Sequence, residues 1–79
     1  MVMTLTLQKD NIMNMIPVNS SAISFIGYDN SSMKMKITFK QGKTYNYCNV
    51  PQSIYSSFKN ASSIGRYYDS YIKDRYNCL

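Results

Sequence analysis

The sequence predicts an α+β fold, in which a three-stranded antiparallel β-meander is followed by two α-helices packed on one face of the sheet. Residues 34–50 alternate apolar and polar side chains on either side of Gln41-Gly42, which is typical of a β-hairpin. After Pro51 the spacing of the apolar residues lengthens from two to about four, which indicates amphipathic helices. The chain of 79 residues is long enough for one modest core. We expect residues 1–16 to form a flexible arm and residues 17–79 a single domain.

The three predicted strands cover residues 22–28, 33–40 and 44–50. The first has Ile23, Phe25 and Ile26 at its apolar centre, and Asp29 begins a turn, because Asp and Asn side chains bond their own backbone. The second strand should carry its apolar residues on one face and its lysines on the other, since successive side chains of a strand point in opposite directions. The apolar face holds Met33, Met35, Ile37 and Phe39, and the other holds Lys34, Lys36, Thr38 and Lys40.

Two short helices should follow. Pro51 suits the first helical position, where its missing N–H costs nothing. Residues 60–63 should break the helix, and Ser62 or Ser63 can cap the next one. The first stripe of apolar residues is Ile54, Tyr55, Phe58 and Ala61; the second is Ile64, Tyr68, Ile72 and Tyr76, widened by Tyr67 and Tyr71.

The composition is basic, with nine Lys and Arg residues against four Asp, a net charge of +5 and a pI near 9.3. Such a balance favours nucleic acid or another acidic partner, although lysines on an outward strand face also serve solubility. The candidate nucleic-acid-binding residues are Lys34, Lys36, Lys40, Lys43 and Arg66.

The two cysteines, without a recognisable signal peptide, favour two free thiols in a reducing cytosol, and a Cys48–Cys78 bridge is the alternative. Residues 1–16 fit neither a signal peptide nor a membrane span, because charged and Asn residues interrupt them. We therefore expect a cytoplasmic protein without membrane contact. The composition is rich in residues with AT-rich codons, which fits a mobile or phage-borne gene and, if phage-borne, action in the host cytoplasm.

Catalysis is not expected. The chain has no His and its four acidic residues are all Asp, so Cys48 lacks an ordinary base to activate it. Two cysteines without histidine cannot complete a four-ligand zinc site, and we predict no metal and no cofactor. Asp29 is better explained as a turn residue than as a catalytic acid.

Three ordered segments resemble the KTSC domain, which is named for the C-terminus of some lysyl-tRNA synthetases and also occurs as a small stand-alone protein in bacteria and phages. The resemblance spans residues 18–76. The matching positions are Val18, Ser20, Ser21, Ile23, Ile26, Gly27, Tyr28 and Asp29, then Gly42, Tyr45, Tyr47, Val50, Pro51 and Tyr55, then Ala61, Ser63, Gly65 and Tyr67. The synthetase association implies RNA binding, by analogy.

The hairpin turn decides where Tyr45 and Tyr47 point. A two-residue loop at Gln41-Gly42 would place both rings beside the lysines, as a platform on which RNA bases stack. A three-residue loop with Gly42 in a left-handed bulge would instead pair Ile37 with Tyr45 and Met35 with Tyr47. We favour the bulged loop, because it requires a positive φ of Gly42 and not of Gln41. Both rings then join the core. Tyr28, of the same aromatic motif, is a candidate for either core packing or base stacking.

The predicted function is therefore a small non-enzymatic binding module. Its expected partner is nucleic acid, RNA rather than DNA, held by a basic strand face. The alternative is a protein-interaction module that acts on an acidic host protein through exposed tyrosines. An accessory domain without activity of its own also fits, and the sequence does not fix an oligomeric state.

Overall fold

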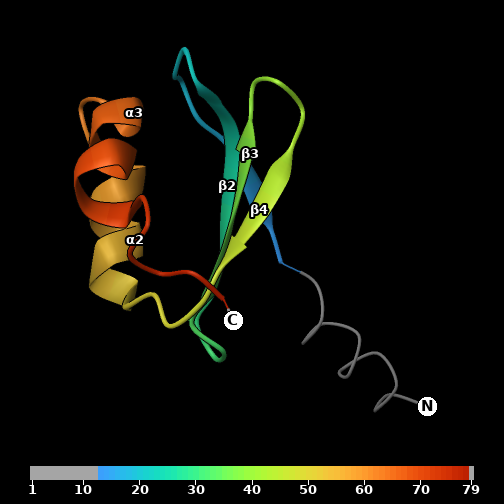
Figure 1. Ribbon diagram of the computed structural model, residues 1–79, viewed down its shortest axis with the longest axis vertical. Coiled ribbons are helices and arrows are strands. Elements are labelled where there is room, and N and C mark those ends of the chain that lie inside the picture. Colours follow the sequence, from blue (N-terminus) through green and yellow to red (C-terminus); the bar gives the residue numbers. More distant parts are fainter. Residues whose placement is uncertain (1–12, 79) are drawn as a thin grey trace.

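The computed structural model describes residues 13–78, which form a four-stranded antiparallel sheet with helices against one face (Figure 1). The strand order β1-β2-β3-β4 follows the chain. The strands are β1 (Met15–Pro17), β2 (Ile23–Asp29), β3 (Lys34–Phe39) and β4 (Thr44–Tyr47), and the helices are α2 (Gln52–Lys59), α3 (Ile64–Tyr67) and the π-helix η1 (Tyr68–Ile72). Because α3 runs directly into η1, the two form one continuous helix. The α+β class with a meander and two helices is therefore confirmed, whereas the number of strands is four and not three.

The additional strand is β1, which pairs with β2 through Ile16 and Ile26. It has only three residues and ends at Pro17, so its alternation is too short to detect in the sequence. Gly27 permits this pairing, because a Cβ atom there would lie 2.9 Å from the carbonyl oxygen of Asn14. The predicted arm lies mostly outside the described residues, and its last two positions belong to β1.

A bulge in β2 changes which side chains reach the core. Ile23 pairs with Phe39 and Phe25 with Thr38, so two steps along β2 match one step along β3. The extra residue lets both Ile23 and Ile26 point inward, and both are fully buried. Phe25 was predicted at the apolar centre of this strand, but it points to the uncovered face and is 42 % exposed.

The core lies between the sheet and the helices. Its buried residues come from β2, β3, β4, all three helices and the connection between β4 and α2: Ile23, Ile26, Met35, Ile37, Tyr47, Val50, Phe58, Ile64 and Ile72. Phe58 is the one fully buried residue of α2, and its ring stacks on Tyr67 at a centroid distance of 5.8 Å. The predicted apolar face of the second strand is therefore confirmed for Met35 and Ile37, which are fully buried. It is wrong for Met33, which lies in the turn before β3 with a positive φ and is exposed.

The helix boundaries differ in detail from the prediction. Pro51 precedes α2 as its N-cap residue, and Asn60 ends that helix. Ser63 caps α3, because its hydroxyl oxygen accepts a hydrogen bond from the Arg66 N–H at 3.3 Å. The second helix continues as a π-helix and ends at Ile72, since the Lys73 N–H bonds the Tyr68 carbonyl at 2.8 Å. Tyr76 thus lies beyond the helix that was predicted to contain it.

Cys48 and Cys78 form a disulfide, with their Cα atoms 5.0 Å apart, so the prediction of two free thiols is wrong. The C-terminal segment runs back along β4: the Cys48 N–H donates to the Tyr76 carbonyl at 2.8 Å, and Tyr47 forms an antiparallel bridge with Asn77. This return brings the two cysteines together, although 30 positions separate them. The prediction of free thiols rested on the expected compartment, and no local signal in the sequence indicates the return of the chain.

Candidate nucleic-acid interface

The β3–β4 hairpin has the register that the bulged turn predicts. Ile37 pairs with Tyr45 and Met35 with Tyr47. Gly42 has a φ of +104°, which a residue with a side chain rarely adopts, and its N–H bonds the Phe39 carbonyl at 2.8 Å. Tyr45 and Tyr47 consequently lie on the same face of the sheet as the buried side chains of Met35 and Ile37.

Tyr47 belongs to the core side, as predicted, and Tyr28, for which core and stacking roles were both open, also packs against the core. Tyr47 is 5 % exposed, and its hydroxyl shares a 3.1 Å hydrogen bond with that of Tyr68. Burial, and then this hydrogen bond, raise the pKa of the Tyr47 hydroxyl. Tyr28 donates a 2.6 Å hydrogen bond to the Val50 carbonyl and stacks on Tyr55. Both rings are therefore held by core contacts, and Tyr47 is too deeply buried for a base to stack on it.

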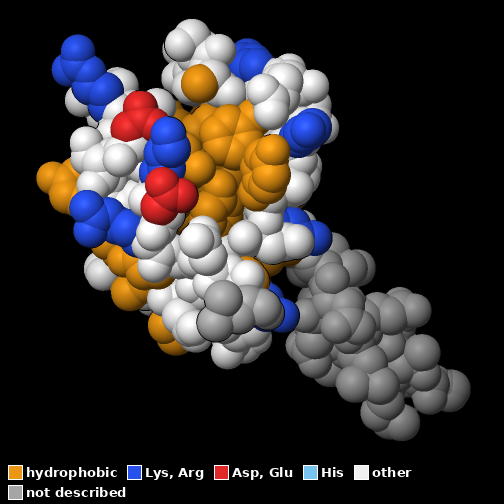
Figure 2. All heavy atoms as spheres, viewed as in Figure 1, with side chains coloured by type: hydrophobic (Ala, Val, Ile, Leu, Met, Phe, Trp, Pro, Cys, Tyr) orange, Lys and Arg blue, Asp and Glu red, His pale blue; other side chains and the backbone are white. Residues whose placement is uncertain are grey.

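Tyr45 departs from the prediction that both hairpin tyrosines are buried, because 45 % of it is exposed. Tyr45 lies nearer the hairpin turn than Tyr47 does. It is on the core side of the sheet, where the helices cover it only in part. Its ring meets Phe39 edge to face at 5.6 Å, and Phe39 meets Tyr68 in the same way at 5.3 Å. We call Phe39, Tyr45 and Tyr68 the aromatic edge. Figure 2 shows hydrophobic side chains open to solvent between the helices and the hairpin.

The hairpin lysines fall into two groups. Lys36 is exposed between the buried Met35 and Ile37, so it points to the uncovered face of the sheet. The Phe39 N–H donates to the Lys43 carbonyl at 2.9 Å, so these residues oppose each other across the hairpin. Opposed side chains share a face, which places Lys43 on the side of Tyr45. The predicted basic strand face, which is the uncovered face of the sheet, thus holds Lys34 and Lys36. Lys43 lies on the opposite face, together with the aromatic edge.

Distance separates the two groups further. Lys34 and Phe39 are the two ends of β3, about 16 Å apart for a strand that rises about 3.3 Å per residue. This exceeds the Debye length of about 8 Å at physiological salt, so Lys34 contributes little to an anion held at the aromatic edge. Lys40 lies in the turn itself, where its N–H bonds the Ala22 carbonyl at 2.9 Å. The lysines next to the edge are therefore Lys40 and Lys43.

Arg66 does not join the hairpin lysines. It is exposed on α3, in the helix layer, where it lines a shallow cleft of about 220 Å³ with Tyr67, Ser70 and Tyr71. Tyr71 is 54 % exposed and its ring lies 4.6 Å from that of Tyr67. The cleft is a second surface that combines two tyrosines with one cation, Arg66. In the sequence, Tyr67 and Tyr71 were assigned only to the apolar stripe of the helix.

Asp29, the remaining candidate residue, has a structural role. Asp29 accepts hydrogen bonds from the hydroxyls of Ser32 at 2.8 Å and Ser31 at 2.9 Å, which lower the pKa of its carboxyl group. It holds the β2–β3 turn. Within residues 13–78 no cluster of His, Cys, Asp and Glu side chains could hold a metal ion. None of the helices in this part of the chain has the length and apolar character needed to cross a bilayer.

Comparison with known proteins identifies relatives of the whole fold. The family description of the KTSC domain matches residues 19–76. The crystal structure of a KTSC domain protein from Yersinia pestis superposes with a TM-score of 0.82 at 38 % identity, over 86 % of this chain and 96 % of that one. A protein of Tsukamurella paurometabola is 35 % identical over 82 % of this chain and 97 % of its own length. An uncharacterized protein of Stutzerimonas stutzeri is 27 % identical over 81 % of this chain and 90 % of its own.

Proposed function

The chain belongs to the KTSC domain family, and from this premise we propose that it is a non-catalytic module that binds single-stranded RNA at the aromatic edge of its hairpin. The observation that carries the proposal is the half-exposed ring of Tyr45, fixed against Phe39 and flanked by Lys43. An aromatic face stacks any base, and a neighbouring ammonium group attracts the adjoining phosphate. Edge-to-face packing on Phe39 holds the ring in place before a base arrives.

The binding would be weakly sequence-specific and strongly dependent on salt. Stacking on one tyrosine does not distinguish the bases, and lysines meet the phosphate as point charges. The hairpin favours an anionic partner, because Lys34, Lys36, Lys40 and Lys43 lie in it and residues 34–48 contain no acidic side chain. The preference for RNA over DNA rests on the analogy with the synthetase-linked members of the family.

Replacing Tyr45 with alanine is expected to weaken RNA binding about tenfold, since stacking on an aromatic side chain contributes about 1–3 kcal/mol per base. The matched control is Tyr71→Ala, which removes a more exposed tyrosine from the helix layer and should leave affinity unchanged. Fluorescence anisotropy of a labelled oligouridylate measures both. A folded Tyr45→Ala variant that binds like the parent would refute the proposal.

Salt dependence separates the two groups of lysines. For single strands the slope of log K against log salt is about −0.7 for each phosphate neutralised. Lys43→Gln should reduce the slope by about that amount, whereas Lys34→Gln, at the far end of β3, should leave it unchanged. The opposite pattern would move the interface to the uncovered face of the sheet.

Capture of an acidic protein is the second candidate, and the helix-layer cleft favours it. Tyr and Arg are enriched at interface hot spots, and Arg66 lines this cleft with Tyr67 and Tyr71. Pull-down from a host lysate treated with nuclease, using the parent, Tyr45→Ala and Tyr71→Ala, tests it. Loss of a partner with Tyr71→Ala alone supports protein binding, and loss of every partner after nuclease contradicts it.

RNA as the partner places the protein's action in the cytoplasm, or in the host cytoplasm for a phage-borne gene. Cytosolic thiols are normally kept reduced, whereas this structure holds a disulfide. Phe39, Tyr45 and Lys43 are not part of the disulfide or of the C-terminal segment that it fixes. RNA binding is therefore expected in both redox forms, and the assays above should be run with and without reductant.

A further inference from the structure

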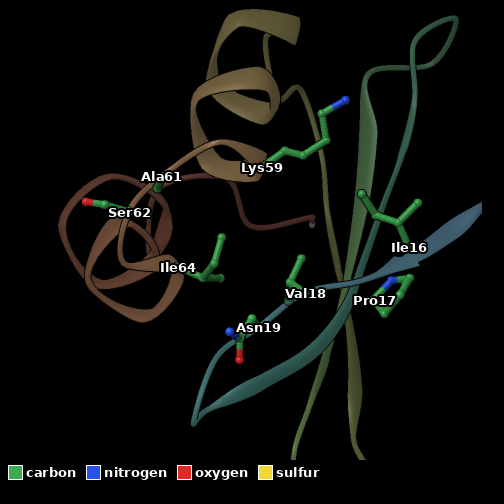
Figure 3. Close-up of a pocket in the computed structure, with 8 residues that line it drawn as sticks. All are labelled: Ile16, Pro17, Val18, Asn19, Lys59, Ala61, Ser62 and Ile64. Atoms are coloured by element: carbon green, nitrogen blue, oxygen red, sulfur yellow. The ribbon is translucent and has the colours of Figure 1, made fainter.

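The two edges of the sheet are closed in different ways. At β1 the Val18 N–H donates to the Ser24 carbonyl at 3.0 Å, so the backbone of the preceding residue, Pro17, faces away from the sheet. Proline has no N–H to offer to another strand, and it is one of the residues that protect an exposed edge. Figure 3 shows Pro17 and Val18 at this edge, where they line the groove between β1 and the helices. The β1 edge is therefore closed by its own sequence.

The β4 edge lacks such a residue, because β4 contains neither a proline nor a charged side chain. The Lys43 carbonyl bonds the Phe39 N–H, so every second residue from Lys43 onward turns its backbone groups toward β3. The residues between them, Thr44 and Asn46 and then Cys48, turn theirs outward. Outward backbone groups on a strand without charges are a template for a further strand.

Residues 73–78 cover this edge. The Tyr76 carbonyl accepts a 2.8 Å hydrogen bond from the Cys48 N–H, and the Tyr76 side chain is partly buried against the core. The first three residues of the segment are exposed. Cys78 is also exposed and Cys48 is half-buried, so a small thiol can reach the disulfide that fixes the segment. Once the disulfide is broken, the Tyr76 ring is the main side-chain anchor that remains.

We propose that reduction of the Cys48–Cys78 disulfide opens the outer edge of β4 to an extended peptide strand of another protein. The reductant is a dithiol, which gives two electrons and two protons to the cysteine sulfurs and itself becomes a disulfide. The resident segment defines the partner, because the incoming strand takes its place: it bonds the Cys48 backbone and carries an aromatic side chain where Tyr76 lies.

A second copy of the chain is a poorer occupant, since each copy carries a net charge of +5 and the two repel each other. The site uses backbone groups at the outer edge of β4 and not the ring of Tyr45, so it does not rest on RNA binding.

The probe is a synthetic peptide with the sequence of residues 73–78 and serine in place of the cysteine, followed by amide shifts of the full chain in NMR. The parent in dithiothreitol should show saturable shifts at Asn46 and Cys48. Its own segment still competes at an effective concentration of about 1 mM, so half-saturation should not be reached below that value. The oxidised parent should show no shifts. A peptide with alanine in place of the tyrosine should bind about tenfold more weakly, because it loses the apolar anchor.

Tyr76→Ala in the reduced full chain weakens the resident segment and not the probe, so the half-saturating concentration should fall severalfold. Arg75→Ala, at the neighbouring exposed position, is the matched control and should behave as the parent does. The proposal is overturned if the oxidised protein binds the peptide equally well, or if the reduced protein gives no saturable shifts at β4. It is also overturned if the reduced chain unfolds, since the edge is then lost, or if it dimerises through the β4 amides, which would make a second copy the occupant.

Discussion

Replacing Cys48 and Cys78 together with serine should lower the free energy of unfolding by about 3.5 kcal/mol. The disulfide closes a loop across 30 positions, and the chain-entropy model assigns that much stabilisation to a loop of this length. A chain of 79 residues has a total stability of about 4–12 kcal/mol, so the loss is a large part of it. Urea unfolding followed by circular dichroism measures the difference at equilibrium.

Reduction of the parent protein provides the control, because it breaks the same bond without changing any residue. It should give nearly the same loss of stability as the double serine variant. Hydrogen exchange adds a local reading: the Cys48 amide, which bonds the Tyr76 carbonyl, should exchange faster once the C-terminal segment is released. Two reactive thiols in the protein purified without reductant, or a loss below about 1 kcal/mol, would contradict this account of the segment.

Phe58→Ala should destabilise the fold by about 4 kcal/mol. Phe58 is fully buried, packs on Tyr67, and is the single side chain by which α2 enters the core completely. Truncating a buried phenylalanine loses the transfer free energy of the ring and leaves a cavity, which together cost about 3–5 kcal/mol. The variant should therefore unfold at a much lower urea concentration than the parent.

Ser57→Ala, at the adjacent exposed position of the same helix, is the matched control and should change stability by no more than about 0.5 kcal/mol. A loss of less than about 1 kcal/mol for Phe58→Ala would mean that α2 does not anchor the helix layer. Comparison with the disulfide variant also separates two contributions, since Phe58 acts in the folded core and the disulfide chiefly restricts the unfolded chain.

The part of the fold predicted best from sequence is the part governed by local backbone chemistry. Gly42 alone can adopt its positive φ without strain, and this requirement fixed the hairpin register and the side of the sheet to which Tyr47 points. Ser63 as a cap and the Asp29 turn follow from the same kind of reasoning, because each side chain bonds backbone or hydroxyl groups two or three residues away.

The features of the fold that were not predicted from the sequence depend on contacts between distant segments. The bulge beside Ile23 turned Phe25 outward, and it is recognisable only from the pairing with β3. The disulfide requires the chain to return along β4 after Ile72, where an early end to the helix was not predicted. The side of the sheet on which Tyr45 lies was predicted correctly. Its exposure depends on how far the helices extend over the sheet, and the helices leave the Tyr45 side chain about half uncovered.

The location of the RNA on the surface is the most direct test of the proposed interface. Titration of the full chain with a short oligouridylate, followed by amide and tyrosine ring shifts in NMR, reports every face at once. The proposed interface predicts the largest shifts at Phe39, Lys43 and Tyr45, with Tyr71 unmoved. Shifts centred on Phe25 and Lys36, on the uncovered face of the sheet, would contradict it, as would an unchanged spectrum at low salt.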